Sequence, residues 1–299
     1  MGAMPSQVLV MLNQPSLDAP AHDPAAAQWR LADPAAPQLS VLDLGATRGD
    51  GIFETLSIGF GKPQAFDHHL RRFAASAAAL DLPAPDASAW RAAILAAVAE
   101  LDPAEEAWAK AVMTRGVEGD GRPTGWVYAA HSADFTRERT EGVAVVLLDR
   151  GYRHDVESTS PWLLTGAKTL SYAINRAVAR EAARRGAQDV VFVSSDGYLL
   201  EGPTSTLVYR RGDTLFSPGT GLGILDGTTL ANVFRFAGER GLSTGFELGT
   251  PDSLRGADAA WLVSSVRLAA PIRSVDGIPL GADPEFTAAL NAWLRVLAE

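Results

Sequence analysis

Cysteine is absent from this 299-residue sequence, and lysine is scarce. Without cysteine there is no disulfide framework, no thiol nucleophile and no metal site with thiolate ligands. Of the 26 basic residues only Lys62, Lys110 and Lys168 are lysines, and the rest are arginines. Because the arginine guanidinium stays protonated, any chemistry that needs a neutral side-chain amine has three candidates.

Patterns typical of metal and nucleotide sites are also missing. The five histidines show no His-x-x-x-His spacing and no acidic cluster at ligand spacing, so we predict no metal site. Neither a Walker-type nor a Rossmann-type glycine fingerprint occurs, and no Gly-x-Ser-x-Gly segment marks a hydrolase nucleophile.

An excess of positive charge and long apolar runs are lacking as well. The net charge of −9 argues against a nucleic-acid partner, since phosphate neutralisation requires an excess of Lys and Arg. No apolar run approaches the roughly 20 residues that span a bilayer, so we expect no membrane partner. The opening Met1–Met4 resembles the remnant of a tag, and no basic segment followed by an apolar one stands near the start. We therefore expect a cytoplasmic protein.

The length and composition suit a globular protein of two domains. A polar, charged stretch at 132–142 is the predicted interdomain linker. It separates a smaller N-terminal α/β domain, residues 1–131, from a larger C-terminal domain, residues 143–299. Strand and helix patterns are interleaved in both.

Periodicity predicts the main elements of each domain. In the first we expect strands at 8–12, 51–58, 107–115 and 125–130, and helices capped by Asp67 and spanning 88–101. In the second we expect strands at 143–148, 206–210 and 214–217, a hairpin of 190–194 with 198–201, and helices over 170–186 and from 227.

Lys168 is the first candidate for chemistry. It lies between Gly166-Ala167 and Thr169, and these small neighbours leave room for a planar ligand close to the backbone. Partial burial would favour the neutral amine that Schiff-base formation requires. The alternative is a solvated lysine in the first turn of a helix, where the helix dipole disfavours a cation.

Four further residues could bind parts of one anionic, aromatic ligand. Glu201 follows an apolar strand and could pair with a protonated ring nitrogen, or it could face water. Thr228 and Thr229 open a helix whose unpaired N–H groups could bind a phosphate, although a threonine N-cap is equally common. Arg72 could supply a bidentate contact to that phosphate, or be a solvated helix arginine.

The order of these segments resembles the class IV aminotransferases, the fold-type IV group of pyridoxal-phosphate enzymes. The resemblance covers roughly residues 41–280 and is carried by the segments Arg48–Thr55, His69–Phe73, Thr114–Gly116, Lys168–Tyr172, Asp196–Tyr198, Glu201–Gly202, Gly223–Thr229 and Val263–Ser265.

The resemblance implies a two-domain α+β fold with pyridoxal 5'-phosphate between the domains, and a homodimer. It implies that Lys168 carries the cofactor as a Schiff base and is the catalytic residue, with Glu201 at the ring nitrogen. The remaining implied cofactor ligands are Arg72, Tyr172, Ser205, Thr228, Thr229 and Ser265.

Differences from the family pattern concern the substrate. The D-amino-acid members bind the substrate carboxylate with an Arg-x-His pair after Thr-Arg-Gly, whereas here Arg122 is displaced and no histidine follows. We take Phe53, Thr55, Arg115 and Arg122 as candidate substrate residues. Ser171 also replaces an asparagine that lyase and D-amino-acid members often carry, and Thr206 replaces another.

The motif spellings resemble the D-amino-acid aminotransferase and aminodeoxychorismate lyase branches of the family. We therefore predict an enzyme that transfers an amino group from a D-amino acid or (R)-amine to a 2-keto acid. The alternative is 4-amino-4-deoxychorismate lyase, which forms 4-aminobenzoate and pyruvate. A branched-chain L-amino acid aminotransferase and a non-catalytic relative are further alternatives.

Overall fold

A computed structural model describes residues 4–297, so most of the tag remnant predicted at the start lies outside the described residues. The chain divides into two compact units. The first unit contains the chain up to Ala133 and the segment Ala167–Tyr172. The second contains Asp134–Gly166 and Ala173–Arg295. The short segment at 167–172 therefore belongs to the first unit although its flanking residues belong to the second.

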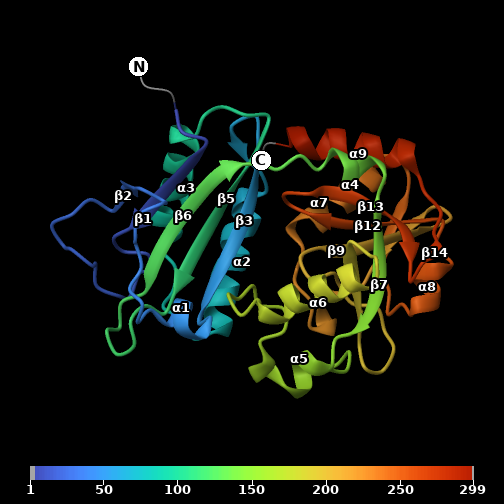
Figure 1. Cartoon of the computed structure of the whole chain (residues 1–299), viewed down its shortest axis with the longest axis horizontal. Helices are drawn as coiled ribbons and strands as arrows, with labels where there is room; N and C mark the ends of the chain where they lie inside the picture. The colour runs from blue at the N-terminus through green and yellow to red at the C-terminus, as the bar shows by residue number, and fades with distance from the viewer. Residues whose placement is uncertain (1–3, 298–299) are drawn as a thin grey trace. The chain divides into compact units, whose positions relative to one another are not determined.

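The first unit is built on one antiparallel sheet with the strand order β2-β1-β6-β5-β3-β4 (Figure 1). Its strands are β1 Gln7–Leu12, β2 Trp29–Ala32, β3 Gly51–Gly59, β4 Lys62–Pro63, β5 Glu106–Thr114 and β6 Thr124–His131. Its helices are α1 Leu44–Arg48, α2 Phe66–Ala79 and α3 Ala87–Glu100. The predicted strands and the pairing of 107–115 with 125–130 are confirmed.

One face of this sheet packs against α2 and α3. The side chains of Ile52, Leu56 and Ile58 alternate along β3 and are buried, as period-2 geometry requires for a half-covered strand. Across the helices Phe73 of α2 meets Trp90 of α3 edge to face, with ring centroids 4.8 Å apart.

The starts of the two helices differ from each other and, for α2, from the expectation. The Asp86 carboxylate accepts hydrogen bonds from the N–H groups of Ser88 and Ala89 and caps α3. Asp67 was predicted to cap α2, and this is wrong: Ala65 is the N-cap, without a side-chain hydrogen bond, and Asp67 lies in the first turn.

The segment 167–172 lies along the edge of β3. The N–H of Phe53 donates to the Lys168 carbonyl at 3.0 Å, and the N–H of Leu170 donates to the Gly51 carbonyl at 2.8 Å. Thr169 forms an isolated antiparallel bridge with Ile52. A Cβ on Gly51 would come within 2.8 Å of the Leu170 side chain of this segment and within 2.7 Å of the Met113 carbonyl oxygen of β5, so glycine allows the strand to be approached from both sides.

The second unit contains an eight-stranded mixed sheet of the order β11-β10-β9-β12-β13-β7-β8, with β14 paired to β13 (Figure 1). The pairs β13–β7, β7–β8 and β10–β11 are parallel and the others antiparallel. The strands are β7 Val143–Asp149, β8 Asp189–Val193, β9 Thr206–Arg211, β10 Thr214–Ser217, β11 Ser243–Phe246, β12 Ala259–Ser264, β13 Leu268–Val275 and β14 Ile278–Pro279.

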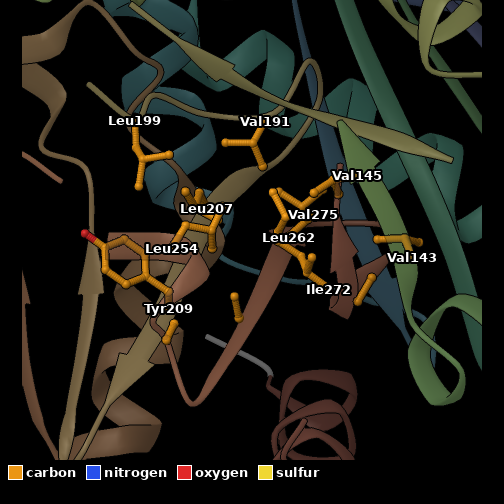
Figure 2. Packing of buried hydrophobic residues seen from close by; sticks show 13 residues of the cluster. Val143, Val145, Val191, Leu199, Leu207, Tyr209, Leu254, Leu262, Ile272 and Val275 are labelled. Atoms are coloured by element: carbon orange, nitrogen blue, oxygen red, sulfur yellow. The ribbon is translucent and has the colours of Figure 1, made fainter. Parts of the chain in front are cut away.

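Apolar residues of these strands form the core of the second unit. Figure 2 shows side chains from β7, β8, β9, β12 and β13 converging with Leu254 of a neighbouring helix. Leu207 and Leu262 are fully buried, and so is the ring of Tyr209. A second cluster contains Val190, Phe192 and Leu200. Because several strands are apolar on both faces, they read as continuous hydrophobic runs in the sequence.

The helical segments of the second unit are α4 Thr136–Thr140, α5 Val156–Thr159, η1 Pro161–Leu163, α6 Ala173–Arg184, η2 Thr220–Leu222, α7 Thr228–Gly238, α8 Pro251–Arg255 and α9 Pro284–Val296. Helix α4 lies within the segment 132–142 that was predicted as a linker. None of the helices in the described part of the chain is long and apolar enough to cross a membrane.

Two predicted elements differ from the structure. The helix expected over 170–186 begins only at Ala173, and Ile174 is 55% exposed rather than part of a buried face. The second strand of the predicted hairpin, 198–201, forms a bridge between Leu199 and Val193 but no strand, and β8 pairs instead in parallel with β7.

Candidate active site

Lys168 is held in an extended segment and not in a helix. Its N–H donates to the Ser76 hydroxyl of α2 at 3.1 Å, and its carbonyl accepts the hydrogen bond from Phe53. The side-chain amine lies 4.3 Å from the centroid of the Phe53 ring. The expected alternative of a lysine in the first turn of a helix is therefore wrong, because α6 starts five residues later.

Phe53 connects Lys168 to a second aromatic residue. The rings of Phe53 and Tyr172 meet edge to face, with centroids 5.4 Å apart and an interplanar angle of 78°. The N–H of Tyr172 donates to the Leu170 carbonyl at 2.7 Å, which turns the chain beside β3. The structure thus brings together three predicted site residues: Lys168, Tyr172 and Phe53. Thr55 lies two residues further along the same face of β3.

The other face of β3 carries a buried ion network. The Arg72 Nε and Nη2 donate to the two carboxylate oxygens of Glu54 at 2.6 and 2.7 Å. The His69 Nδ1 lies 2.6 Å from Glu54 Oε2. All three side chains are at most 9% exposed. Arg72 is therefore not the solvated helix arginine that the sequence left open.

The ionisation of this network follows from its contacts. Burial by itself raises the pKa of the Glu54 carboxyl, but Arg72 and His69 outweigh burial and lower that pKa to about 2. For His69 burial dominates over the opposing effect of Glu54, and the pKa of the ring is lowered. Glu54 is thus an anion at neutral pH, and a neutral His69 donates its Nδ1–H to it.

Glu54 and His69 were missed as functional candidates, although the sequence contained a signal for both. Glu54 stands between Ile52 and Leu56 at alternating positions of a strand, so its side chain had to enter the apolar face. His69 and Arg72 are three residues apart on a helix, so they had to lie on the same side.

In the second unit, Glu201 lies beside the turn that precedes α7. Its carboxylate Oε1 accepts the N–H of Leu225 at 3.2 Å, and its carbonyl accepts the N–H of Phe192 at 2.9 Å. Both contacts fix the position of the carboxylate, and its side chain is half-buried. A half-buried glutamate next to a loop suits the predicted pairing with a ring nitrogen better than a water-facing strand end.

The start of α7 gathers backbone N–H groups and hydroxyls in one place. Gly227 is the N-cap and makes no side-chain cap, while Thr228 and Thr229 are buried. The Thr228 and Ser265 hydroxyl oxygens are 3.3 Å apart. A Cβ on Gly227 would come within 2.3 Å of the Thr206 hydroxyl, so the backbone approaches β9 closely here. The arrangement is typical of an anion site at a helix N-terminus.

Ser205 adds an unpaired polar atom to this unit. Its side chain is 6% exposed, and its Oγ has no hydrogen-bond partner among residues 4–297. An orphaned buried hydroxyl is costly unless a ligand satisfies it. Together with the hydroxyls at the start of α7, Ser205 fits a ligand with phosphate and polar ring substituents. No group of three or more metal-ligating side chains occurs in the described residues.

The predicted substrate arginines make contacts within the first unit. Arg115 pairs with Asp50 through Nε at 2.6 Å, and its other nitrogens donate to the carbonyls of Leu80 and Asp81 at the end of α2. Arg122 forms an ion pair with Asp120, two residues earlier. These contacts do not support substrate binding by either arginine, and that role stays a prediction.

Comparison with known proteins places these features in a family. The sequence profile of the family described as amino-transferase class IV matches residues 51–275, more than half of the chain. The chain belongs to the class IV aminotransferases and is a pyridoxal-phosphate-dependent enzyme.

Individual relatives support the same family assignment. A bifunctional aminodeoxychorismate lyase / D-amino acid transaminase of Mycobacterium tuberculosis is 41% identical over 84% of this chain and 90% of its own length. A fold IV transaminase from Curtobacterium pusillum matches with a TM-score of 0.93 and 52% identity, covering 97% of this chain and 98% of that one. A PLP-bound hypothetical aminotransferase from M. tuberculosis matches with a TM-score of 0.87 and 37% identity, covering 97% and 99%. The expected two-domain fold-type IV architecture is confirmed.

The buried network predicts an acid-sensitive contribution to stability. Because the pKa of Glu54 is lowered from 4.5 to about 2 on folding, the contribution is complete above about pH 4.5 and is lost as the pH falls towards 2. At pH 7 the substitution Glu54→Gln should lower the free energy of unfolding by roughly 3–5 kcal/mol, since it leaves Arg72 buried without its counter-charge. Urea denaturation of both proteins across this pH range measures the difference.

The exposed Glu100 of α3 provides the matched control, and Glu100→Gln should leave the urea midpoint unchanged. A destabilisation by Glu54→Gln that stays the same from pH 7 to the acid limit would contradict the ionic origin of the effect.

Proposed function

We propose that this enzyme transfers an amino group from a D-amino acid or (R)-amine to a 2-keto acid, with Lys168 as the lysine that binds pyridoxal 5'-phosphate. The observation that carries the proposal is the position of the Lys168 amine. It lies over the Phe53 ring on a segment held by backbone hydrogen bonds to β3. The motifs around it resemble the D-amino-acid and lyase branches of the family.

The remaining cofactor contacts are proposed from the chemistry of each side chain. The Glu201 carboxylate holds a proton on the pyridine nitrogen, which makes the ring a better electron acceptor. Thr228, Thr229 and Ser265 donate to the phosphate with the N-terminus of α7, and Arg72 supplies positive charge. The Ser205 hydroxyl, which has no partner among residues 4–297, donates a hydrogen bond to the cofactor.

When bound, pyridoxal phosphate supplies an aldehyde for amine exchange and a ring that accepts electrons from the substrate α-carbon. The protein's own contribution is proton transfer and orientation. The Lys168 amine, in its neutral form, takes the α-proton from the substrate. In a transamination it gives this proton to the cofactor carbon that carried the aldehyde. The Phe53 ring, whose centroid is 4.3 Å from this amine, shields one side of it, and Tyr172 packs edge to face against that ring.

A lyase acting on 4-amino-4-deoxychorismate is the second candidate. It is favoured by one observation: the M. tuberculosis relative at 41% identity is named as both lyase and D-amino acid transaminase. Both reactions begin with removal of the same α-proton, so the residues proposed for proton transfer and cofactor binding serve either one.

We also propose that the enzyme is a homodimer. Three apolar residues lie close together on the chain before α1 and are exposed in the single chain: Leu39 by 40%, Val41 by 84% and Leu42 by 64%. Exposed apolar residues gathered in one segment are typical of a protein interface. A second copy of the chain would bury them.

Replacement of the proposed cofactor lysine tests the central assignment. Lys168→Ala should lower transaminase turnover by at least about 10²- to 10⁴-fold, the usual contribution of a general acid–base group. The variant should also lack the visible absorption band of lysine-bound cofactor. Lys62→Ala, which alters an exposed lysine of β4, should retain both band and turnover. Full activity of Lys168→Ala would refute the assignment.

The choice of reaction is tested with alternative substrates. D-alanine added to the cofactor-loaded enzyme should convert the visible band into that of the pyridoxamine form, and L-alanine should do so far more slowly. (R)-1-phenylethylamine tests the amine donor in the same way. A band that ignores all three, together with release of 4-aminobenzoate from 4-amino-4-deoxychorismate, would replace the transaminase proposal with the lyase.

The dimer is tested by sedimentation. The protein should sediment at twice the chain mass of 31.6 kDa, because association removes the apolar residues before α1 from water. The variant Val41→Asp should shift the equilibrium towards the monomer, whereas Val296→Asp, at an exposed valine at the end of α9, should not. A wild-type protein that sediments only as a monomer would overturn the proposal.

A further inference from the structure

The sheet of the first unit has a second face, turned away from α2 and α3. Strand register shows which residues share this face, because directly opposed residues in antiparallel strands point the same way. Thr55 of β3 opposes Lys110 of β5, and Lys110 opposes Tyr128 of β6. In the neighbouring row Phe53 opposes Val112, which opposes Trp126. Strand β5 therefore places the Lys110 amine on this face among aromatic side chains.

Lys110 is the cation of this face. Its Nζ lies 5.6 Å from the centroid of the Phe53 ring and 5.5 Å from that of Trp108. It makes no hydrogen bond or ion pair with any of residues 4–297, and its side chain is half-buried. Burial lowers the pKa of this amine. A half-buried ammonium without a counter-charge is costly, and an anionic ligand would relieve that cost.

The same Phe53 ring lies next to both lysines of this region. The Lys168 amine is 4.3 Å from the ring centroid and the Lys110 amine 5.6 Å. The two amines are consequently separated by no more than the sum of these distances. In an amino acid the carboxylate is attached to the carbon whose amine reacts, so a cation near the cofactor lysine is within reach of it.

The other cations considered for the substrate carboxylate have partners already. Arg115 is paired with Asp50, and Arg122 with Asp120. Lys110 faces Thr55 and the rings of Phe53 and Trp108 and has no acidic partner among residues 4–297. The Tyr128 ring lies 5.5 Å from Trp108, and its hydroxyl donates to Gln7 at 2.7 Å. The rings are therefore held in place beside the amine and leave its N–H groups available to an acceptor.

We propose that Lys110 binds the α-carboxylate of the amino-acid donor and of the keto-acid acceptor, and that Phe53 and Trp108 flank the bound substrate. This inference rests on the function proposed above and adds the residue that replaces the missing Arg-x-His pair. Lys110 is a substrate-binding residue and takes no part in proton transfer. It determines specificity for substrates that carry a carboxylate over amines that lack one.

The variant Lys110→Met keeps the length and apolar stem of the side chain and removes its charge. It should raise the KM for D-alanine by about 10- to 100-fold, the usual effect of losing a hydrogen bond to a charged group, and change kcat little. The KM for (R)-1-phenylethylamine, which has no carboxylate, should stay the same. Lys110→Arg should restore most of the affinity for D-alanine.

A binding measurement provides a readout that does not depend on turnover. Calorimetric titration of 2-oxoglutarate into the pyridoxamine-phosphate form should give a Kd raised by a similar factor in Lys110→Met. The affinity of the apo protein for pyridoxal phosphate should be unchanged, because Lys110 is not a proposed cofactor ligand. Lys62→Met serves as the control and should alter none of these values.

The outcomes separate this inference from the proposed function. If the wild-type enzyme turns over none of the donors, the transaminase proposal fails, and the 2-oxoglutarate titration alone decides the role of Lys110. Equal losses in kcat for D-alanine and for the amine, or an unchanged Kd for 2-oxoglutarate, would overturn the inference. If Lys110→Met raised the KM for D-glutamate but left that for D-alanine unchanged, the assignment to the α-carboxylate would be overturned, since Lys110 would then contact the side-chain carboxylate.

Discussion

The backbone pairing of residues 168–170 with the edge of β3 is the contact on which the candidate site depends. Two hydrogen bonds, from Phe53 to Lys168 and from Leu170 to Gly51, hold an otherwise irregular segment against a regular strand. Fixing this backbone has a conformational entropy cost that is met in folding, before any ligand binds. The Lys168 amine is thereby placed over the Phe53 ring.

The two-residue period of β3 then divides the chemistry between two faces. Phe53 and Thr55 point to the open face with the two lysines, whereas Glu54 points to the covered face and pairs with Arg72 and His69. A buried ion network of this kind is weak evidence for stability, because apolar residues of similar size often stabilise as well or better. It does hold the guanidinium of Arg72 in one orientation, which is consistent with the phosphate contact proposed for this residue.

The candidate anion-binding groups of the second unit are neutral, unlike the ion network of the first unit. The N-terminus of α7, the hydroxyls of Thr228 and Ser265 and the orphaned Ser205 are all positioned by buried backbone rather than by ion pairs. Preorganised neutral donors need no rearrangement when an anion arrives. The close approach of Gly227 to Thr206 shows why the turn requires glycine: any side chain there would displace β9 or the helix start.

Much of the architecture was determined by the sequence alone. Continuous or alternating apolar residues predicted β1, β3, β5 and β6, and helical spacing predicted α2, α3 and α7, because these patterns depend on local geometry. The ordered motifs specified the family, and with it Lys168, Glu201 and the threonines of α7 as candidates. The Glu54–His69–Arg72 network was also readable in principle, since strand and helix periods place all three on one buried side.

Tertiary structure alone decided the rest. No local pattern shows that residues 167–172 stay outside the following helix and pair with the edge of β3. The partners in this pairing are more than a hundred residues apart in the chain. The same holds for Arg115, whose partners Asp50 and Leu80 come from distant segments. Lys110 is the clearest example of a residue that the sequence could not single out. It is one of three lysines, and it becomes a candidate substrate-binding residue only because strand register places it beside Thr55 and near Phe53.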